Sequence, residues 1–553
     1  MLVDTTVGVD EVAGLPCYWV DSGRNTLSAS LIFRVGMVDE TLPTTGWLHL
    51  VEHLALHGRE KGALHVNGST SLLTTQFDFH GPREAVLECL SDVITWLTDP
   101  DVSRLPAEAR VLRAESEYRG SGDSALALLQ RYGARGPGLA GYSEPGLTRA
   151  DEHGLRDIVA RLFVAANGVL ALDGAPPATL PVLPTGHRLA LPQRPSGESS
   201  DPAAYITQGR LVLSGEVPRT LPAMFVPHVL QDMLRRDLRE KAQGAYAPWG
   251  SYEAVDADVA IAFCGSDIAA SLMPDVVHHV TSGLDALGRN GPIEGVVEDA
   301  VASASQSLRD PMQAPGMAWR AALRDLAGHP PQTPAQYAEE LAAVTRADVA
   351  ALIPGFADSL LLGVPGQATW RDEFPMLSLP SVRGRPSGSR HRSRGFPQDR
   401  SVLAIDGEHL QVASDGVVQR IAFAEVAGIF ANEDGRRRVV DHAGWGITVE
   451  PTLWRNGTRA VELLDSRVPP ELRMHFPRRD DDTIPRPPTV PVRWLAWLRA
   501  EKVLIGRIAW VLVCMVIAGV GIALGRLLPL VTGVVFGGLI VRDIVKQRRA
   551  ARE

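Results

Sequence analysis

An alternation of strand and helix patterns, which occurs twice along the chain, most constrains its fold. Runs rich in β-branched and aromatic residues predict strands, and segments with apolar residues at helical spacing predict helices. In residues 1–174 the strands are predicted at 28–35 and 72–79 and the helices at 46–57, 85–97 and 107–118. In residues 205–366 the strands are predicted at 209–214 and 259–264 and the helices at 223–239 and 273–287. The repetition predicts an α+β fold that arose by internal duplication.

Proline-rich and basic stretches divide the chain further. Residues 175–204 predict a linker, because prolines and small polar residues do not sustain a packed element. Residues 367–400, whose second part is rich in arginine, predict a disordered basic linker. Residues 401–476 contain two Asp-Gly turns between short alternating runs, a pattern typical of β-hairpins. We therefore expect a small β-rich module there, followed by a membrane anchor at 493–553.

The anchor rests on two uncharged stretches, 508–525 and 527–541. Together they are too long for one straight span of about 20 residues and short for two. Lysines and arginines flank both ends, so the positive-inside rule favours a transmembrane hairpin whose ends both face the cytosol. A single tilted span and a buried soluble helix are the alternatives.

Composition excludes some functions. The chain has 553 residues, with 55 basic and 64 acidic side chains and a net charge of −9, so nucleic acid is not expected as a partner. The four cysteines lie far apart, which predicts neither a disulfide framework nor a cysteine zinc site and favours a reducing compartment. Basic residues are almost all arginine, which indicates a GC-rich bacterial genome. We expect a bacterial membrane protein whose soluble domains face the cytoplasm.

The segment His49-Leu-Val-Glu52-His53 carries the clearest chemical signal. Positions i and i+4 share a face of a helix, so both imidazoles can reach one metal ion. Glu52 lies close enough to take a proton from a metal-bound water. This order, H-x-x-E-H, is a metallopeptidase motif, and two surface histidines on a helix are the plain alternative.

A third protein ligand is expected for a catalytic zinc ion. The predicted helix at 107–118 offers Glu108, Glu115 and Glu117. Glu108 and Glu115 are two helical turns apart and share a face. Glutamates in an arginine-rich helix are ordinarily only a solvated surface, so spacing alone does not select a ligand.

Several ordered motifs resemble the pitrilysin, or insulinase, family of zinc metallopeptidases, which includes insulin-degrading enzyme and the mitochondrial processing peptidases. They are Gly36-Met-Val-Asp-Glu40, the inverted motif after Gly46, the Gly141-Tyr-Ser-Glu-Pro-Gly-Leu-Thr segment, the strand at 166–174, and Asp237-Leu-Arg239 with Tyr246. The resemblance covers roughly residues 10–366. Two features depart from the family pattern: the distance from His53 to the acidic helix is short, and Asn67 is followed by Gly instead of Ala.

The resemblance implies roles for single residues. His49, His53 and Glu115 would bind one Zn²⁺ per chain, Glu52 would be the catalytic base, and Glu108 would support the ligands. Arg239, Tyr246 and Asn67 would contact the substrate. Each of these three also has a plain interpretation: Arg239 as a helix C-terminal cation, Tyr246 as a half-buried sheet residue and Asn67 as a turn former.

The function implied is a membrane-tethered zinc endopeptidase that cleaves short or unfolded peptides between two halves closing like a clamshell, only the first of which holds metal. A peptidase-like scaffold that binds peptides or proteins without cleaving them is the alternative, and a dimer or partner subunit stays open. The β-rich module resembles bacterial pleckstrin-homology-like domains. Without a basic cluster it is expected to be a spacer or a protein-docking module, with lipid-headgroup binding as the alternative.

Overall fold

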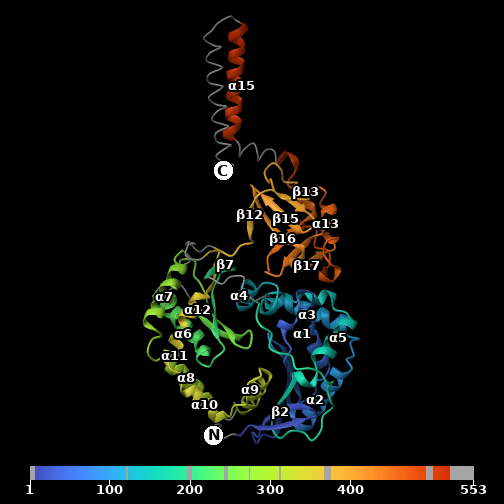
Figure 1. Ribbon diagram of the computed structural model, residues 1–553, viewed down its shortest axis with the longest axis vertical. Helices are drawn as coiled ribbons and strands as arrows, with labels where there is room; N and C mark the ends of the chain where they lie inside the picture. Colours follow the sequence, from blue (N-terminus) through green and yellow to red (C-terminus); the bar gives the residue numbers. More distant parts are fainter. Residues whose placement is uncertain are drawn as a thin grey trace. The chain divides into compact units, whose positions relative to one another are not determined.

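The computed structural model describes residues 6–119, 122–195, 202–241, 247–272, 274–310, 313–366, 375–492 and 502–523 (Figure 1). These residues form two compact units. The first unit comprises Met1–Pro380, Ile421–Thr448 and Arg467–Arg478, and the second comprises Ser381–Arg420, Val449–Ser466 and Arg479–Glu553.

The first half of the first unit contains a mixed sheet in the order β1-β2-β6-β3-β5-β4. Its strands are β1 (Gly8–Val12), β2 (Leu15–Val20), β3 (Thr26–Phe33), β4 (His65–Thr70), β5 (Thr75–Pro82) and β6 (Gly168–Asp173). The strands predicted at 28–35 and 72–79 are β3 and β5, each displaced by a few residues. Strand β4 is an edge of this sheet, and among the described strands it pairs only with β5.

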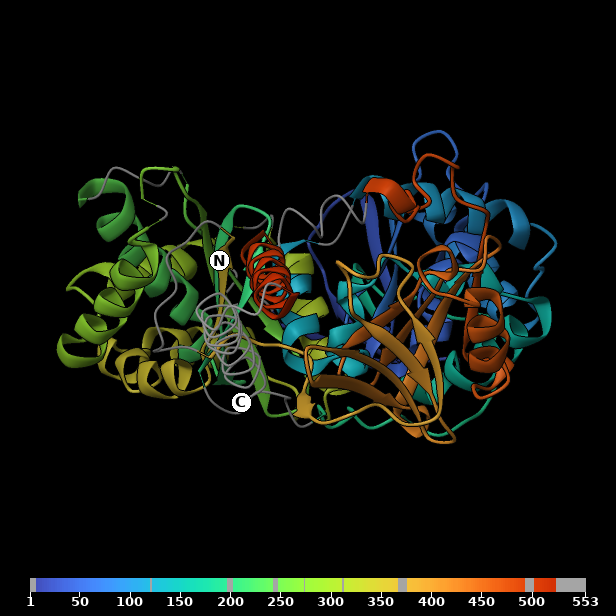
Figure 2. The same cartoon turned by 90° about the horizontal axis from the view of Figure 1, so that it is seen from above.

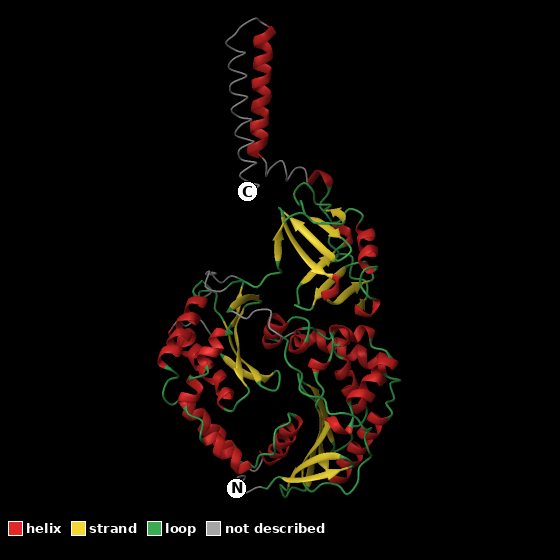
Figure 3. Cartoon of the chain, in the orientation of Figure 1, coloured by secondary structure: helices red, strands yellow, loops and turns green. Residues whose placement is uncertain are grey.

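One face of this sheet is covered by helices, which Figure 3 shows in red beside the yellow strands. They are α1 (Trp47–Leu56), α2 (Arg83–Thr98), α3 (Leu105–Arg119) and α5 (Glu152–Leu162). Alternate residues of β3, among them Leu31 and Phe33, point into this core, as the period of two in a strand requires. Burial of these apolar side chains fixes α1 and α3 side by side on one sheet.

The second half repeats this topology without a counterpart of β1, and Figure 2 shows the halves as separate lobes, blue and green. Its sheet has the order β7-β11-β8-β10-β9. Its strands are β7 (Ala203–Thr207), β8 (Arg210–Pro218), β9 (Trp249–Ala254), β10 (Val259–Asp267) and β11 (Leu361–Pro365). In each half one parallel pair, β2 with β6 or β7 with β11, adjoins antiparallel neighbours. This correspondence matches the predicted internal duplication.

The helices of the second half pack on one face of its sheet. They are α6 (Val226–Leu234), α7 (Val276–Asn290), α8 (Val296–Ser307), α10 (Pro334–Ala342), α11 (Arg346–Ala350) and α12 (Ile353–Asp358). The helix predicted at 223–239 is α6 continued by the π-helical segment η8 (Arg235–Lys241).

Each half lends one helix to the open face of the other half's sheet. Helix α9 (Ala314–Leu326) of the second half buries Ala318 and Ala322 against Ile32 and Val169 of the first sheet. Helix α4 (Asp123–Tyr132) of the first half packs on β8 and β10 of the second. The buried Arg131 of α4 donates hydrogen bonds to the carbonyl oxygens of Ser214 and Ser359, at 2.9 and 2.8 Å. The exchange binds the two halves into one unit.

Nine strands of the C-terminal region form two further sheets among the described residues. The five-stranded sheet contains β12 (Ser381–Arg383), β13 (Ser389–Arg392), β14 (Val402–Ile405), β15 (His409–Ser414) and β16 (Val417–Ala422). The four-stranded sheet contains β17 (Val426–Asn432), β18 (Arg437–Asp441), β19 (Gly446–Val449) and β20 (Arg473–Phe476). The predicted hairpin turns at Asp406-Gly407 and Asp415-Gly416 connect β14 to β15 and β15 to β16, so this prediction is confirmed.

The prediction of a disordered tether is wrong for residues 381–400. Strands β12 and β13 lie there, and they pair with β16 and β14 at opposite edges of the five-stranded sheet. Their sequence is polar and rich in arginine because only one strand neighbour and little apolar surface are needed at an edge. Composition alone does not reveal backbone pairing with distant strands.

The anchor region is described only in part. Helix α15 spans Lys502–Ala523 and includes most of the apolar stretch 508–525. Its exposed side chains include Trp510, Leu512, Val516 and Ile522. Among the described residues, none of the helices combines the length and the hydropathy that crossing a membrane requires. The second predicted stretch, 527–541, lies outside the described residues.

Candidate metal centre

Helix α1 is fixed at its N-terminus by a half-buried carboxylate. Gly46 precedes the helix with a φ of 86°, a left-handed conformation that favours glycine. The Glu40 carboxylate accepts hydrogen bonds from the N–H groups of Gly46 and Leu48, at 3.2 and 2.9 Å. Burial raises the pKa of Glu40 to about 8, although these N–H groups favour the anion. The Gly-x-x-x-Glu turn noted in the sequence thus sets where α1 begins.

The structure brings together the three predicted ligands. His49 and His53 are one turn apart on α1, with ring centroids 4.9 Å apart, and Glu115 reaches them from α3. One ligand atom of each lies within 4.8 Å of the others, and Glu115 Oε2 is 3.9 Å from His53 Nε2. Two imidazole nitrogens and a carboxylate oxygen are a donor set suited to zinc.

Glu52 lies beside this cluster on the same helix. It is buried, and its Oε2 is 3.7 Å from His49 Nε2. Strand β4 passes directly over it: a Cβ on Gly68 would come within 2.3 Å of Glu52 Oε1. In this conformation the glycine after Asn67, a departure from the family pattern, leaves the room that the Glu52 carboxylate occupies.

Glu144 is a member of the site that the sequence analysis did not single out. Its Oε1 lies 2.7 Å from His49 Nδ1, and its Oε2 accepts a hydrogen bond of 2.6 Å from the Ser116 hydroxyl. Burial lowers the pKa of His49, but the hydrogen bond and charge of Glu144, together with the charges of Glu52 and Glu115, outweigh it, and the net shift of this pKa is upward. The Gly141-Tyr-Ser-Glu motif contains this residue, but nothing in its spacing predicts the contact with His49.

The Nδ1 atom of His53 lies farther from its carboxylate neighbour than the Nδ1 atom of His49 does. Glu108 Oε2 is 3.7 Å from His53 Nδ1, whereas Glu108 Oε1 is closer, 3.2 Å, to His57 Nδ1. Burial, followed by repulsion from His49, lowers the pKa of His53, so this imidazole tends to be neutral. A neutral imidazole is the form that binds a metal.

The remaining predicted residues have different surroundings. Asn67 is exposed on the edge strand β4, opposite Asp78 of β5. Arg239 is exposed on η8 of the second half. Tyr246 lies outside the described residues, as does the side chain of Glu117.

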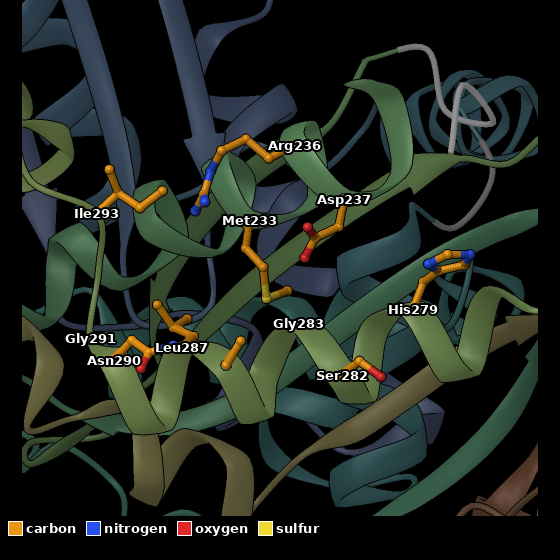
Figure 4. Close-up of a pocket in the computed structure, with 11 residues that line it drawn as sticks. Met233, Arg236, Asp237, His279, Ser282, Gly283, Leu287, Asn290, Gly291 and Ile293 are labelled. Carbon is orange, nitrogen blue, oxygen red and sulfur yellow. The ribbon is translucent and has the colours of Figure 1, made fainter. Parts of the chain in front are cut away.

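Two cavities help to locate the site. A cavity of about 260 Å³ opens beside His49 and is lined by Glu40, Tyr142 and Glu144, among others. A larger one, of about 460 Å³, lies between η8 and α7 in the second half (Figure 4). Its ionisable lining residues are Arg236, Asp237 and His279, and it contains none of the residues of the metal centre. Of the three predicted ligands, His49 is the one that lines the smaller cavity, which lies on the side of this imidazole that Glu144 occupies.

Comparison with known proteins identifies the fold. No protein-family model matches the chain, and neither does any curated protein. A protease from Helicobacter pylori has a TM-score of 0.55 at 12% identity and covers 65% of this chain and 100% of its own. An inactive domain of peptidase M16 from Pseudomonas fluorescens has a TM-score of 0.54 at 16% identity, covering 66% and 100%. A chain of complex III2 from Candida albicans has a TM-score of 0.52 at 14% identity, covering 66% and 96%. The chain has the fold of M16-like peptidases.

The geometry predicts which glutamate binds metal. We expect full-length protein to bind about one zinc ion, and Glu115→Ala to weaken binding by more than the ~10–100-fold that loss of a supporting residue costs. Glu117→Ala is the matched control on the same helix and is expected to bind zinc like the wild type. Zinc affinity is measured by competition with a chromogenic chelator. The reverse ranking of the two variants would show that the acidic ligand has been misassigned.

Proposed function

We propose that the protein is a zinc-dependent endopeptidase that cleaves short or unfolded peptides. The observation that carries this proposal is the convergence of His49, His53 and Glu115 within 4.8 Å, with the buried Glu52 beside them. The M16-like peptidase fold also supports it, and the cluster lies on helices α1 and α3 of the first half. In this proposal the three side chains hold one Zn²⁺ per chain. Glu108 and Glu144 lie beside the Nδ1 atoms of the two imidazoles.

The chemistry divides between the ion and the chain. When bound, zinc lowers the pKa of a coordinated water toward 7 and polarises the scissile carbonyl. Glu52 accepts the proton of the attacking water and returns it to the leaving amine. Its burial against Gly68 excludes bulk solvent from the carboxylate and keeps it on the side of the cluster that faces β4.

Substrate would bind along β4. Because β4 is an edge strand, its free N–H and C=O groups can pair with an extended peptide, which gives affinity with little sequence specificity. Asn67, exposed on β4, would contact the peptide. Arg239 and Tyr246 of the second half would stabilise the developing oxyanion when the halves close like a clamshell.

A non-catalytic scaffold is the second candidate function. The similarity to an inactive domain of peptidase M16 favours it, since such a domain keeps the fold. The chain nevertheless has every residue of the inverted motif, and the structure brings the motif together with an acidic ligand. A dimer or partner subunit is compatible with either function. Nucleic acid is not proposed as a partner, because the net charge is −9.

We also propose that the C-terminus anchors the protein in a bacterial cell membrane, with the soluble parts in the cytoplasm. The support is the apolar sequence from 508 to 541 and the cations at both of its ends. The exposed apolar side chains of α15, such as Val516 and Ile522 at 67% and 68%, agree with a lipid environment. Two spans in a hairpin are proposed over a single tilted one, and the resemblance of residues 401–476 to pleckstrin-homology-like domains stays a prediction.

The first test separates binding from catalysis. Glu52→Gln should keep about one zinc ion per chain and lose roughly 10²–10⁴-fold in turnover of a quenched peptide mixture, because the amide cannot accept the proton. Zinc content is measured on the same samples. Equal turnover in the variant and the wild type, or no zinc in either, would reject the proposed mechanism.

The second test addresses the other half of the chain. Arg239→Ala should lower kcat by roughly 10²–10³-fold, the size of effect seen when an oxyanion donor is lost, and leave zinc affinity unchanged. Arg235→Ala, which removes an exposed arginine of the same segment that pairs with Asp232, is the matched control. If the two variants lose activity equally, Arg239 has no special role.

The third test addresses the anchor. Full-length protein should sediment with membranes after an alkaline wash, whereas the double change Val516→Arg and Ile522→Arg should release it, since each arginine costs about 2.5–3.5 kcal/mol in the bilayer centre. Val516→Leu with Ile522→Leu is the control. Wild-type protein found in the soluble fraction would contradict membrane anchoring.

A further inference from the structure

Part of the β-rich region packs on the half that contains the metal centre. We define the C-terminal sheet as strands β17, β18 and β20, which all belong to the first unit. Ala427, Val440 and Met474 of this sheet are buried together with Leu42 and Leu139 of the first half. The contact is therefore an apolar core of its own.

Aromatic side chains and the backbone extend this contact. The rings of Tyr142 and Phe430 stack with centroids 6.3 Å apart, and those of Phe430 and Phe476 stack at 5.7 Å. The N–H of Ala134 donates a hydrogen bond of 3.0 Å to the carbonyl oxygen of His442. Besides Leu42, the sheet thus touches residues 133–142 of the first half, and this segment leads directly into Glu144.

Glu144 is held in an unusual conformation. Its φ and ψ are 47° and 50°, the left-handed region that non-glycine residues adopt only when their surroundings impose it. The following residues are tied to the start of α1: Trp47 Nε1–H donates to the carbonyl oxygen of Gly146 at 2.9 Å, and Gly146 N–H donates to Thr45 Oγ1 at 3.2 Å. Glu144 is therefore fixed from both sides, by the C-terminal sheet through Tyr142 and by α1 through Gly146.

The position of Glu144 decides how His49 is presented. A carboxylate 2.7 Å from Nδ1 keeps the proton on that nitrogen and leaves Nε2 as the free lone pair. The Ser116 hydroxyl, on the helix that supplies Glu115, donates to the other oxygen of Glu144. One carboxylate thus links a histidine on α1 to the helix that carries the acidic ligand.

We propose that Glu144 is a positioning residue that orients His49 toward the ion, and that the C-terminal sheet holds Glu144 in place. The C-terminal sheet is then a structural component of the metal centre, in addition to any role as a spacer or docking module. This inference rests on the proposed function for the identity of the ion.

Substitutions at Glu144 test whether this residue orients His49. The measured quantity is the zinc affinity of the whole chain, determined by chelator competition. Glu144→Gly suits the left-handed backbone better than glutamate does, so the stability of the fold should not fall, whereas zinc affinity should fall about 10–100-fold. Glu144→Gln, which still offers an acceptor to Nδ1–H, should recover most of that loss. Wild-type affinity in Glu144→Gly would overturn the positioning role.

Phe430→Ala tests whether the C-terminal sheet holds Glu144 in place. It should lower zinc affinity several-fold in the wild type and have no further effect in the Glu144→Gly background, because the sheet acts through Glu144. Leu403→Ala, in the buried core of β14 in the second unit, is the matched control, expected to destabilise its own unit without changing zinc affinity.

The possible results separate the two proposals. Phe430→Ala without effect on affinity, or with an equal effect in both backgrounds, would refute the role of the sheet. A wild-type protein that binds no zinc would refute the proposed function itself. A wild type that binds zinc but is indifferent to Glu144→Gly and Phe430→Ala would refute only this inference.

Discussion

The packing of α1 on the first sheet is the constraint on which the metal centre depends. Its ten residues present Leu50, Val51 and Leu54 to the core, while His49 and His53 face the opposite way. Because the apolar side is fully buried, the helix cannot rotate without exposing core residues, and the two imidazoles keep their orientation. Glu40 fixes the start of the same helix, which sets the position of His49 along its axis. The orientation of the two imidazoles therefore follows from the packing of the core.

Carboxylates surround this face of α1 and are not interchangeable. Glu115 lies beside the imidazole of His53, and Glu144 contacts Nδ1 of His49. Glu108 lies between His53 and His57. Glu52 is held apart from these roles by the close approach of β4 at Gly68. Partial burial strengthens each of these interactions, because little water remains to screen them. A cation bound in this cluster would offset the repulsion among the acids.

The two halves have corresponding strand orders apart from β1, but only one such cluster is found among the described residues. Helix α6 follows β8 as α1 follows β3. In α6, His228, Gln231 and Asp232 have the same spacing as the three residues of the His-x-x-Glu-His motif in the first half. There Asp232 pairs with Arg235 and Arg236, and Gln231 donates to the carbonyl oxygen of Pro248. The exchanged helices α4 and α9 keep the two unlike halves in one unit.

The sequence by itself determined the elements whose signals are local. The i, i+4 spacing of His49 and His53 predicted a shared helix face, the strand and helix periods predicted two similar halves, and Asp-Gly pairs predicted the hairpins of the β-rich region. Tertiary structure alone decided the contacts between distant segments: Glu144 against His49, Gly68 against Glu52, and the C-terminal sheet against residues 133–142. The basic strands β12 and β13 belong to the same class, because their pairing partners lie elsewhere in the chain. Local periodicity reports which face of an element is apolar, whereas the neighbour of that face is fixed only when the whole core packs.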